Sequence, residues 1–282
     1  MNPVLWPEAG GAKLQLKGLG SVRLFLCDTR TMIVALCMLH LLLAQEGATA
    51  ARPQRIAVSV PFIGCNSDGQ VGPMEAPKGT RRSVVIGREA AQKLAYYKAE
   101  QGVGVLAPRG WYCFGTYGSG GDTLFVSPQP IDTTNIFSTG PSGSAGPAIR
   151  VSYRFGGTSG RFSVAEIIAR VFPAYKAFAT AAMKELDQPD GSFTFGPYPT
   201  DTLTYKSKKL VEYRTPAQTE GLGTYSELSK NGMPIAGAAM LVGQPAELDL
   251  VLLSVRLAPD LDGLTTAIVI EFERDAARCP CY

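Results

Sequence analysis

A glycine-rich segment before an apolar-periodic stretch is the place in this sequence where the backbone itself could do chemistry. The segment consists of Gly156, Gly157, Thr158, Ser159, Gly160 and Arg161. Free backbone N–H groups in the first turn of a helix attract anions, and the arginine would add a positive charge. The segment lacks the glycine and lysine spacing of nucleotide-binding loops. It therefore predicts either an anion-binding loop or a plain strand-to-helix turn.

Histidine chemistry is excluded for most of the chain. The single histidine, His40, lies inside a predicted leader, so residues 51–282 contain none. This removes Ser-His-Asp and Cys-His catalysis, histidine acid–base chemistry and histidine-ligated metals from that part. We expect no metal and no cofactor. An enzyme built on these residues would need a carboxylate or lysine with a strongly shifted pKa.

Carboxylates are the remaining candidates for acid–base chemistry, but their spacing selects no pair. A glycoside hydrolase could draw on Asp68, Glu75, Asp122, Asp201, Glu212 and Glu220. A serine–lysine hydrolase would need the S-x-x-K pattern, which the sequence lacks. The lysines of residues 206–209 flank a serine, and a hairpin tip explains them better than a catalytic site.

The cysteines point to one disulfide. Cys65 and Cys113 lie beside glycine-rich turns in well-patterned parts of the chain, whereas Cys279 and Cys281 lie in its last residues. Thiols of an exported protein meet an oxidising compartment and tend to pair. Four cysteines allow three full pairings, and we favour a Cys65–Cys113 bridge. The terminal pair is either part of a loose tail or an incomplete site for a soft metal.

Residues 1–50 have the pattern of a secretory leader. Arg23 and Arg30 precede an apolar run at residues 32–44, which ends in Ala48-Thr49-Ala50. A basic start, a short apolar core and a small-x-small site are typical of a signal peptide, with an uncleaved anchor as the alternative. The lipobox-like glycine before Cys65 offers lipidation as a second, less favoured route to the envelope.

Composition indicates one folded domain after the leader. Of the whole chain, 45% is hydrophobic, enough to bury a substantial core. The net charge of +3 is too small for a nucleic-acid-binding surface. We expect residues 51–282 to form one secreted domain, with a possible lobe boundary in the Gly-, Ser- and Pro-rich residues 138–147. No transmembrane segment is expected there.

The elements that must position these residues begin with a strand at 148–155 and a long helix at 163–186. Apolar residues recur every three or four positions along the helix, and Ser163 with Glu166 forms a predicted capping box. Pro173 should kink or split this helix. A second helix is predicted at residues 89–101, with Gly102 as its C-cap.

Strands dominate the rest. Residues 55–62, 83–86 and 123–127 predict early strands, and residues 203–257 predict an antiparallel meander with a hairpin turn at Asn231-Gly232. Residues 248–257 are almost continuously apolar, as in a central strand. Residues 264–275 fit a helix, although part of the run could be a strand. The fold class is therefore α+β, an antiparallel β-meander with a long helix and shorter helices packed on it.

Four segments resemble those of a family of uncharacterised secreted bacterial proteins with no assigned activity. They are Leu94-Ala95-Tyr96-Tyr97-Lys98-Ala99-Glu100, residues 107–118 (Ala-Pro-Arg-Gly-Trp-Tyr-Cys-Phe-Gly-Thr-Tyr-Gly), residues 156–162 (Gly-Gly-Thr-Ser-Gly-Arg-Phe) and Phe195-Gly196-Pro197-Tyr198-Pro199-Thr200-Asp201. The resemblance covers most of the chain after the leader. It implies export to the periplasm or beyond, and it assigns neither an activity nor a site.

Two function classes follow from these observations. The first is a non-enzymatic protein that binds a ligand or an envelope or extracellular partner, favoured by the absence of catalytic motifs. The second is a histidine-independent hydrolase acting on cell-wall or sugar material. A group of carboxylates gathered in one pocket would favour the second class.

Export can be tested directly. Because the apolar run ends in Ala48-Thr49-Ala50, envelope material should begin at Ala51. N-terminal sequencing of the protein from a cell-envelope fraction measures this. An uncut chain in that fraction would contradict the prediction.

Overall fold

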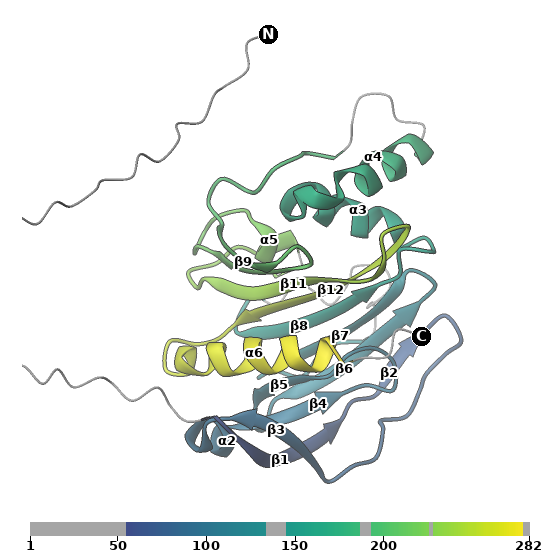
Figure 1. Ribbon diagram of the computed structural model, residues 1–282. Helices are drawn as coiled ribbons and strands as arrows, with labels where there is room; N and C mark the ends of the chain where they lie inside the picture. The colour runs from purple at the N-terminus through teal and green to yellow at the C-terminus, as the bar shows by residue number, and fades with distance from the viewer. Residues whose placement is uncertain (1–54, 134–144, 187–192, 226–227, 279–282) are drawn as a thin grey trace, which may run out of the picture. The chain divides into compact units, whose positions relative to one another are not determined.

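Two β-sheets form the framework of the residues that the computed structural model describes, namely 55–133, 145–186, 193–225 and 228–278 (Figure 1). All of them belong to one unit, Pro53–Tyr282. The separate sheets and the helices packed on them confirm the α+β class. The leader, and residues 138–144 of the predicted lobe boundary, lie outside the described residues.

The smaller sheet has the strand order β3-β1-β4-β5. Its strands are β1 (Ile56–Gly64), β3 (Arg81–Ile86), β4 (Leu94–Lys98) and β5 (Val105–Pro108). β1 pairs with β3 antiparallel and with β4 in parallel, and β4 pairs with β5 antiparallel. A short helix, α2 (Arg88–Lys93), connects β3 to β4.

The larger sheet has eight strands in the order β2-β6-β7-β8-β12-β11-β10-β9. They are β2 (Ser67–Gly69), β6 (Tyr112–Gly118), β7 (Gly121–Ser127), β8 (Ala148–Arg154), β9 (Thr202–Ser207), β10 (Leu210–Thr215), β11 (Ile235–Gln244) and β12 (Glu247–Arg256). The apolar run predicted as a central strand is β12, which lies between β8 and β11 and is buried over most of its length.

Helices cover the two faces of the larger sheet (Figure 1). They are α3 (Arg161–Val171), η1 (Pro173–Tyr175), α4 (Lys176–Glu185), α5 (Leu222–Tyr225), η2 (Asp262–Leu264) and α6 (Thr265–Ala276). α3 and α4 pack against one face of the larger sheet and belong to one hydrophobic cluster. α6 packs between the opposite face and the smaller sheet and belongs to a second hydrophobic cluster. Among the described residues, no helix combines the length and apolarity needed to cross a membrane.

The predicted helix at 163–186 is two helices. Pro173 interrupts it, and a 3-10 turn separates α3 from α4. Proline lacks the N–H that would continue the hydrogen-bond ladder, as expected. The predicted capping box is wrong: α3 begins two residues earlier, so Ser163 lies inside the helix. The carboxylate of Glu166 instead accepts a hydrogen bond from the Tyr225 hydroxyl.

The predicted helix at 89–101 is also wrong beyond Lys93. Residues 94–98 form β4, which is almost wholly buried between β1 and β5. Leu, Ala and Lys favour helix in isolation, but pairing on both sides of a sheet overrides that weak preference. Gly102 does adopt a positive φ of 74°, in the loop after β4 instead of at a helix end.

Asn231-Gly232 does not form the predicted hairpin. The preceding residues contain α5, and Gly232 does not have the positive φ that such a turn needs. The Asn231 side chain instead accepts a hydrogen bond from the Met233 N–H at 2.8 Å. The hairpin lies later, where Gln244 pairs with Glu247 across the turn from β11 to β12.

A disulfide between Cys65 and Cys113 confirms the predicted bridge, with the Cα atoms 5.5 Å apart. Cys65 directly follows β1, and Cys113 lies on β6, so the bond ties the smaller sheet to the larger one. A sulfur in a disulfide cannot carry a lipid, which rules out lipidation of Cys65 in this form. Cys279 and Cys281 lie outside the described residues.

Loss of this bridge should destabilise the protein. The separation of 48 residues corresponds to about 4 kcal/mol in the chain-entropy model, and a disulfide typically contributes about 2–4 kcal/mol. Urea unfolding of the Cys65→Ser, Cys113→Ser double variant measures it. Reductant should lower the wild-type midpoint and leave the variant unchanged; equal midpoints for oxidised wild type and variant would contradict the prediction.

Candidate functional site

Three acidic residues at alternate positions near the end of α6 attach the helix to both sheets. Glu271 and Asp275, one turn apart, face the smaller sheet. The Glu271 carboxylate accepts a hydrogen bond from the Val85 N–H on β3 at 3.0 Å. Asp275 forms an ion pair with Arg82 at 2.6 Å and accepts a hydrogen bond from the Tyr96 hydroxyl. The edge of β3 is thereby bound to the helix.

Glu273 points the other way, to the larger sheet. Its carboxyl group is hydrogen-bonded to Glu212 on β10, and the Lys206 ammonium of β9 lies 3.0 Å from Glu212. Partial burial, together with the neighbouring charge of Glu212, raises the pKa of Glu273 from 4.5 to about 7. The second Glu273 oxygen is buried without a hydrogen-bond partner among the described residues. The Glu273 carboxyl group therefore holds its proton more tightly than a free glutamate does.

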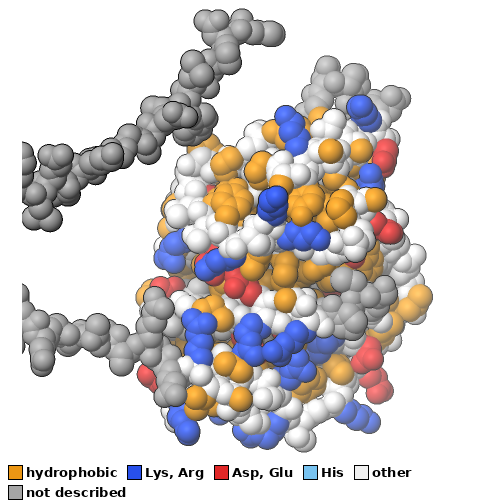
Figure 2. Space-filling model, viewed as in Figure 1, with side chains coloured by type: hydrophobic (Ala, Val, Ile, Leu, Met, Phe, Trp, Pro, Cys, Tyr) orange, Lys and Arg blue, Asp and Glu red, His pale blue; other side chains and the backbone are white. Residues whose placement is uncertain are grey.

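A shallow hollow of about 220 Å³ lies on this side of α6, against β10 and β11. Its polar lining includes Glu212, Arg214 and Asp262, with Thr265 and Thr266 from the first turn of the helix. In Figure 2, Lys and Arg side chains gather around α6 and β3, with Asp and Glu side chains directly above them. Glu212 lines this hollow, and the Lys206 ammonium supplies a positive charge beside it.

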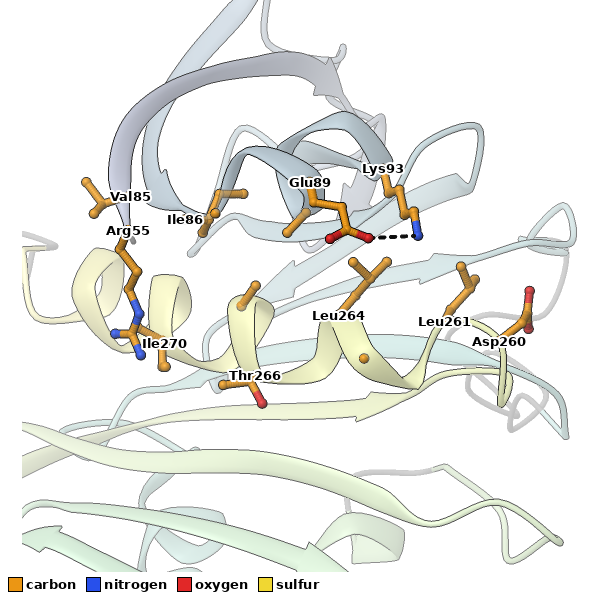
Figure 3. A pocket seen from close by; sticks show the side chains of 14 residues that line it. Arg55, Val85, Ile86, Glu89, Lys93, Asp260, Leu261, Leu264, Thr266 and Ile270 are labelled. Carbon is orange, nitrogen blue, oxygen red and sulfur yellow. Dashed lines mark ion pairs between the residues drawn. The ribbon is translucent and has the colours of Figure 1, made fainter. Parts of the chain in front are cut away.

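A cleft of about 300 Å³ lies on the opposite side of α6, against α2 and β3 (Figure 3). Its wall is mainly apolar, consisting of Val85, Ile86, Ala90, Leu261, Leu264, Ala267 and Ile270. Figure 3 shows Leu264 pointing from the α6 side toward α2, while the Arg55 side chain lies near Ile270 at one end. Glu89 and Lys93, 3.8 Å apart, form the rim. Apolar walls with a few charged groups are typical of ligand sites.

The α2 wall of the cleft is fixed by Arg109, which follows β5. Its guanidinium donates hydrogen bonds to the carbonyl groups of Ala91 and Leu94, at 2.7 and 3.0 Å. Ala91 lies in the last turn of α2 and Leu94 is its C-cap, a place where a helix leaves carbonyl acceptors free and favours a cation. A helix of only six residues is thereby held in place without a long hydrogen-bond ladder.

The predicted anion-binding loop joins β8 to α3. Its Gly156 N–H donates to the Asp249 carboxylate at 2.7 Å, and its Arg161 N–H donates to the Thr158 carbonyl at 3.0 Å. The Arg161 guanidinium lies 3.0 Å from the Glu185 carboxylate and 4.5 Å from the centre of the Phe178 ring. The two backbone donors thus have partners inside the protein, and the guanidinium is engaged in an ion pair. Anion binding at residues 156–161 stays a prediction.

The acidic residues singled out in the sequence are dispersed. Asp122 is buried on β7, and burial raises its pKa to about 7. Asp201 accepts hydrogen bonds from Thr215 and from the Leu222 N–H, both at 2.7 Å. Only Glu212 joins a carboxyl pair, with Glu273, which the sequence analysis did not select. Within the described ranges, no group of three or more His, Cys, Asp or Glu side chains could hold a metal ion.

Glu271 was the available signal for this site. Helical spacing places it one turn after Ile268 and beside Phe272, on the face predicted to be buried, and it is buried in the structure. An acidic residue on a buried helix face needs a partner. That reasoning could have directed attention to α6 and to its two other carboxylates.

The fold and the site define an α+β protein with two hollows beside one helix, α6. No known protein family, no curated protein and no solved structure matches the chain.

The raised pKa of Glu273 predicts a pH-dependent stability. The folded state holds this proton more tightly than the unfolded state, so the stabilisation is complete below about pH 4.5 and is lost as pH rises through about 7. Glu273→Gln should flatten this part of the free energy of unfolding plotted against pH. Asp122→Asn is a parallel variant. The pKa of Asp122 is also raised to about 7, so this variant should remove a second contribution to the free energy of unfolding that is lost as pH rises.

Urea unfolding of both variants and the wild type between pH 4 and pH 8 measures these contributions. The difference between wild type and each variant isolates one carboxyl group. A Glu273→Gln curve that runs parallel to the wild type across the whole range would contradict the raised pKa.

Proposed function

We propose that this chain is an exported protein that binds a small, largely apolar ligand with an anionic group in the cleft between α2 and α6. The cleft is the observation that carries the proposal: about 300 Å³ with mainly aliphatic walls. Removing apolar surface from water contributes about 25 cal/mol per Å², so a ligand gains most of its affinity from these walls.

The charged ends of the cleft would orient the ligand. Arg55 at one end would attract an anionic group, while Asp260 and the Glu89–Lys93 pair mark the other end. A charge-assisted hydrogen bond to a guanidinium is roughly twice as strong as a neutral one. A ligand with one anionic end would therefore lie in a single direction.

Export is supported by the leader pattern and by the disulfide, which is the form that thiols take in oxidising compartments. The ligand would then come from the periplasm or the medium, or from an envelope or extracellular partner. The near-neutral charge argues against nucleic acid as that partner.

A second candidate, a histidine-independent hydrolase, is favoured by the Glu212–Glu273 pair. One carboxyl group would act as a general base on water while the other donates a proton to the leaving group. Glycosidases hold their carboxyl groups about 5–9.5 Å apart, whereas these two are hydrogen-bonded. The arrangement is closer to two carboxylates that share one proton, as in aspartic proteases, so a peptide is the better substrate class.

Binding in the cleft can be tested with 1-anilinonaphthalene-8-sulfonate, a fluorescent probe that joins apolar rings to an anion. Ala267→Phe should fill part of the cleft and reduce the probe affinity about tenfold or more, because the added ring occupies the site. Arg55→Gln should reduce it about threefold to tenfold. Fluorescence titration at several ionic strengths measures both.

Ala246→Phe is the matched control, because it adds the same ring in the exposed turn between β11 and β12. It should leave the probe affinity unchanged. Equal affinity for wild type and Ala267→Phe would remove the cleft as the binding site. Peptide hydrolysis by purified protein that disappears in both Glu212→Gln and Glu273→Gln would favour the hydrolase instead.

A further inference from the structure

The last strand of the larger sheet, β9, presents an open edge. It pairs with β10 on one side and is the terminal strand of the sheet on the other. Five of its six residues are exposed, including Tyr205 at 51%. An open edge offers unpaired N–H and C=O groups to any extended chain that can align with it.

The register identifies which backbone groups of β9 face outward. The Leu241 N–H donates to the Lys209 carbonyl at 2.8 Å, so odd-numbered residues of β10 direct their hydrogen-bonding groups toward β11. Even-numbered residues of β10 then face β9, where Glu212 pairs with Thr204. The alternate β9 residues, Leu203 and Tyr205, direct their N–H and C=O groups away from the sheet.

Other sheet edges are less available. β3, at the edge of the smaller sheet, already donates its Val85 N–H to Glu271 of α6. β2, at the opposite edge of the larger sheet, is only three residues long. β9 is as long as β3 and longer than β2, and more of its residues are exposed than in either of these strands.

The side chains around this edge select the chemistry of a partner. Lys206 lies on the α6 face of β9, where it forms an ion pair with Glu212 and remains partly exposed. Lys208 and Lys209 follow in the turn to β10, and the Lys209 ammonium donates a hydrogen bond to the Gly243 carbonyl. Tyr205 lies on the opposite face, exposed at the rim of the hydrophobic cluster that contains Tyr213. Side chains of an added strand alternate between these two faces. Acidic residues would meet the lysines, and apolar residues would meet Tyr205.

We propose that β9 is a docking edge for an extended segment of a partner protein that alternates acidic and apolar residues and adds to the sheet as a ninth strand. Main-chain hydrogen bonds to Leu203 and Tyr205 supply the pairing, and the alternating side chains supply the selectivity. A second copy of this chain fits less well: antiparallel pairing about Tyr205 would place the Lys206 side chains of both copies at diagonal positions, where like charges repel.

The experiment uses a fluorescent peptide of about eight residues that alternates glutamate and valine, titrated into the purified protein with fluorescence anisotropy as the readout. Saturable binding that weakens with salt is expected. Two control peptides separate the contributions. A lysine–valine peptide has the wrong charge, and a glutamate–valine peptide with N-methylated backbone cannot pair as a strand; neither should bind.

Two variants at one position locate the site. Tyr205→Pro removes an outward N–H and leaves the β10 pairing, which an edge strand tolerates, and should weaken binding at least about tenfold. Tyr205→Thr loses the ring but keeps the N–H, and should weaken binding by less than about fivefold. Lys208→Glu should also weaken binding.

Several results would overturn the proposal. Failure of the glutamate–valine peptide to bind, or equal binding of the N-methylated peptide, would exclude strand addition. Equal affinity of wild type and Tyr205→Pro would move the site away from β9. A concentration-dependent dimer in light scattering that Tyr205→Pro abolishes would assign the edge to a second copy and exclude the acidic partner.

Discussion

The attachment of α6 to both sheets is the interaction on which the rest of the structure depends. A helix placed between two sheets must bury its apolar residues, and any carboxylate it carries there must find a partner. Glu271 and Asp275 bind the edge and the polar side chains of the smaller sheet, while Glu273 binds Glu212 of the larger one. Because these contacts hold the helix from two sides, they also determine the width of both hollows beside it.

The two hollows are physically linked through α6. Thr266 and Ile270 line both of them, and Arg55 lines the apolar cleft while its charge also acts on Glu273. An anionic group placed beside Arg55 would partly neutralise that charge, which otherwise favours the ionised form of Glu273. Occupation of the cleft would therefore favour the protonated carboxyl pair. The proposed binding site and the alternative catalytic site are two sides of one helix.

The sequence predicts what local patterns determine. The continuous apolar run became β12, the proline split the long helix, and the position of two cysteines beside turns predicted the disulfide. Prediction from local sequence is wrong where pairing with distant strands decides the structure. Residues 94–98 favour a helix locally, but pairing with β1 and β5 makes them a strand. Glu212 and Glu273 are 61 positions apart, so no spacing rule could join them.

The carboxyl pair attaches α6 to the larger sheet at a cost. A buried or half-buried polar pair costs desolvation, and apolar residues of similar size often replace such pairs without loss of stability. Glu271 and Asp275 suffice to bind α6 to the smaller sheet, and Ile268 and Phe272 pack in the core. Glu273, with its raised pKa, adds a stabilisation that fades as pH rises toward 7. The contact between Glu273 and Glu212 therefore contributes to the attachment of α6 mainly at acidic pH, whereas the contacts of Glu271 and Asp275 hold the helix on its other side.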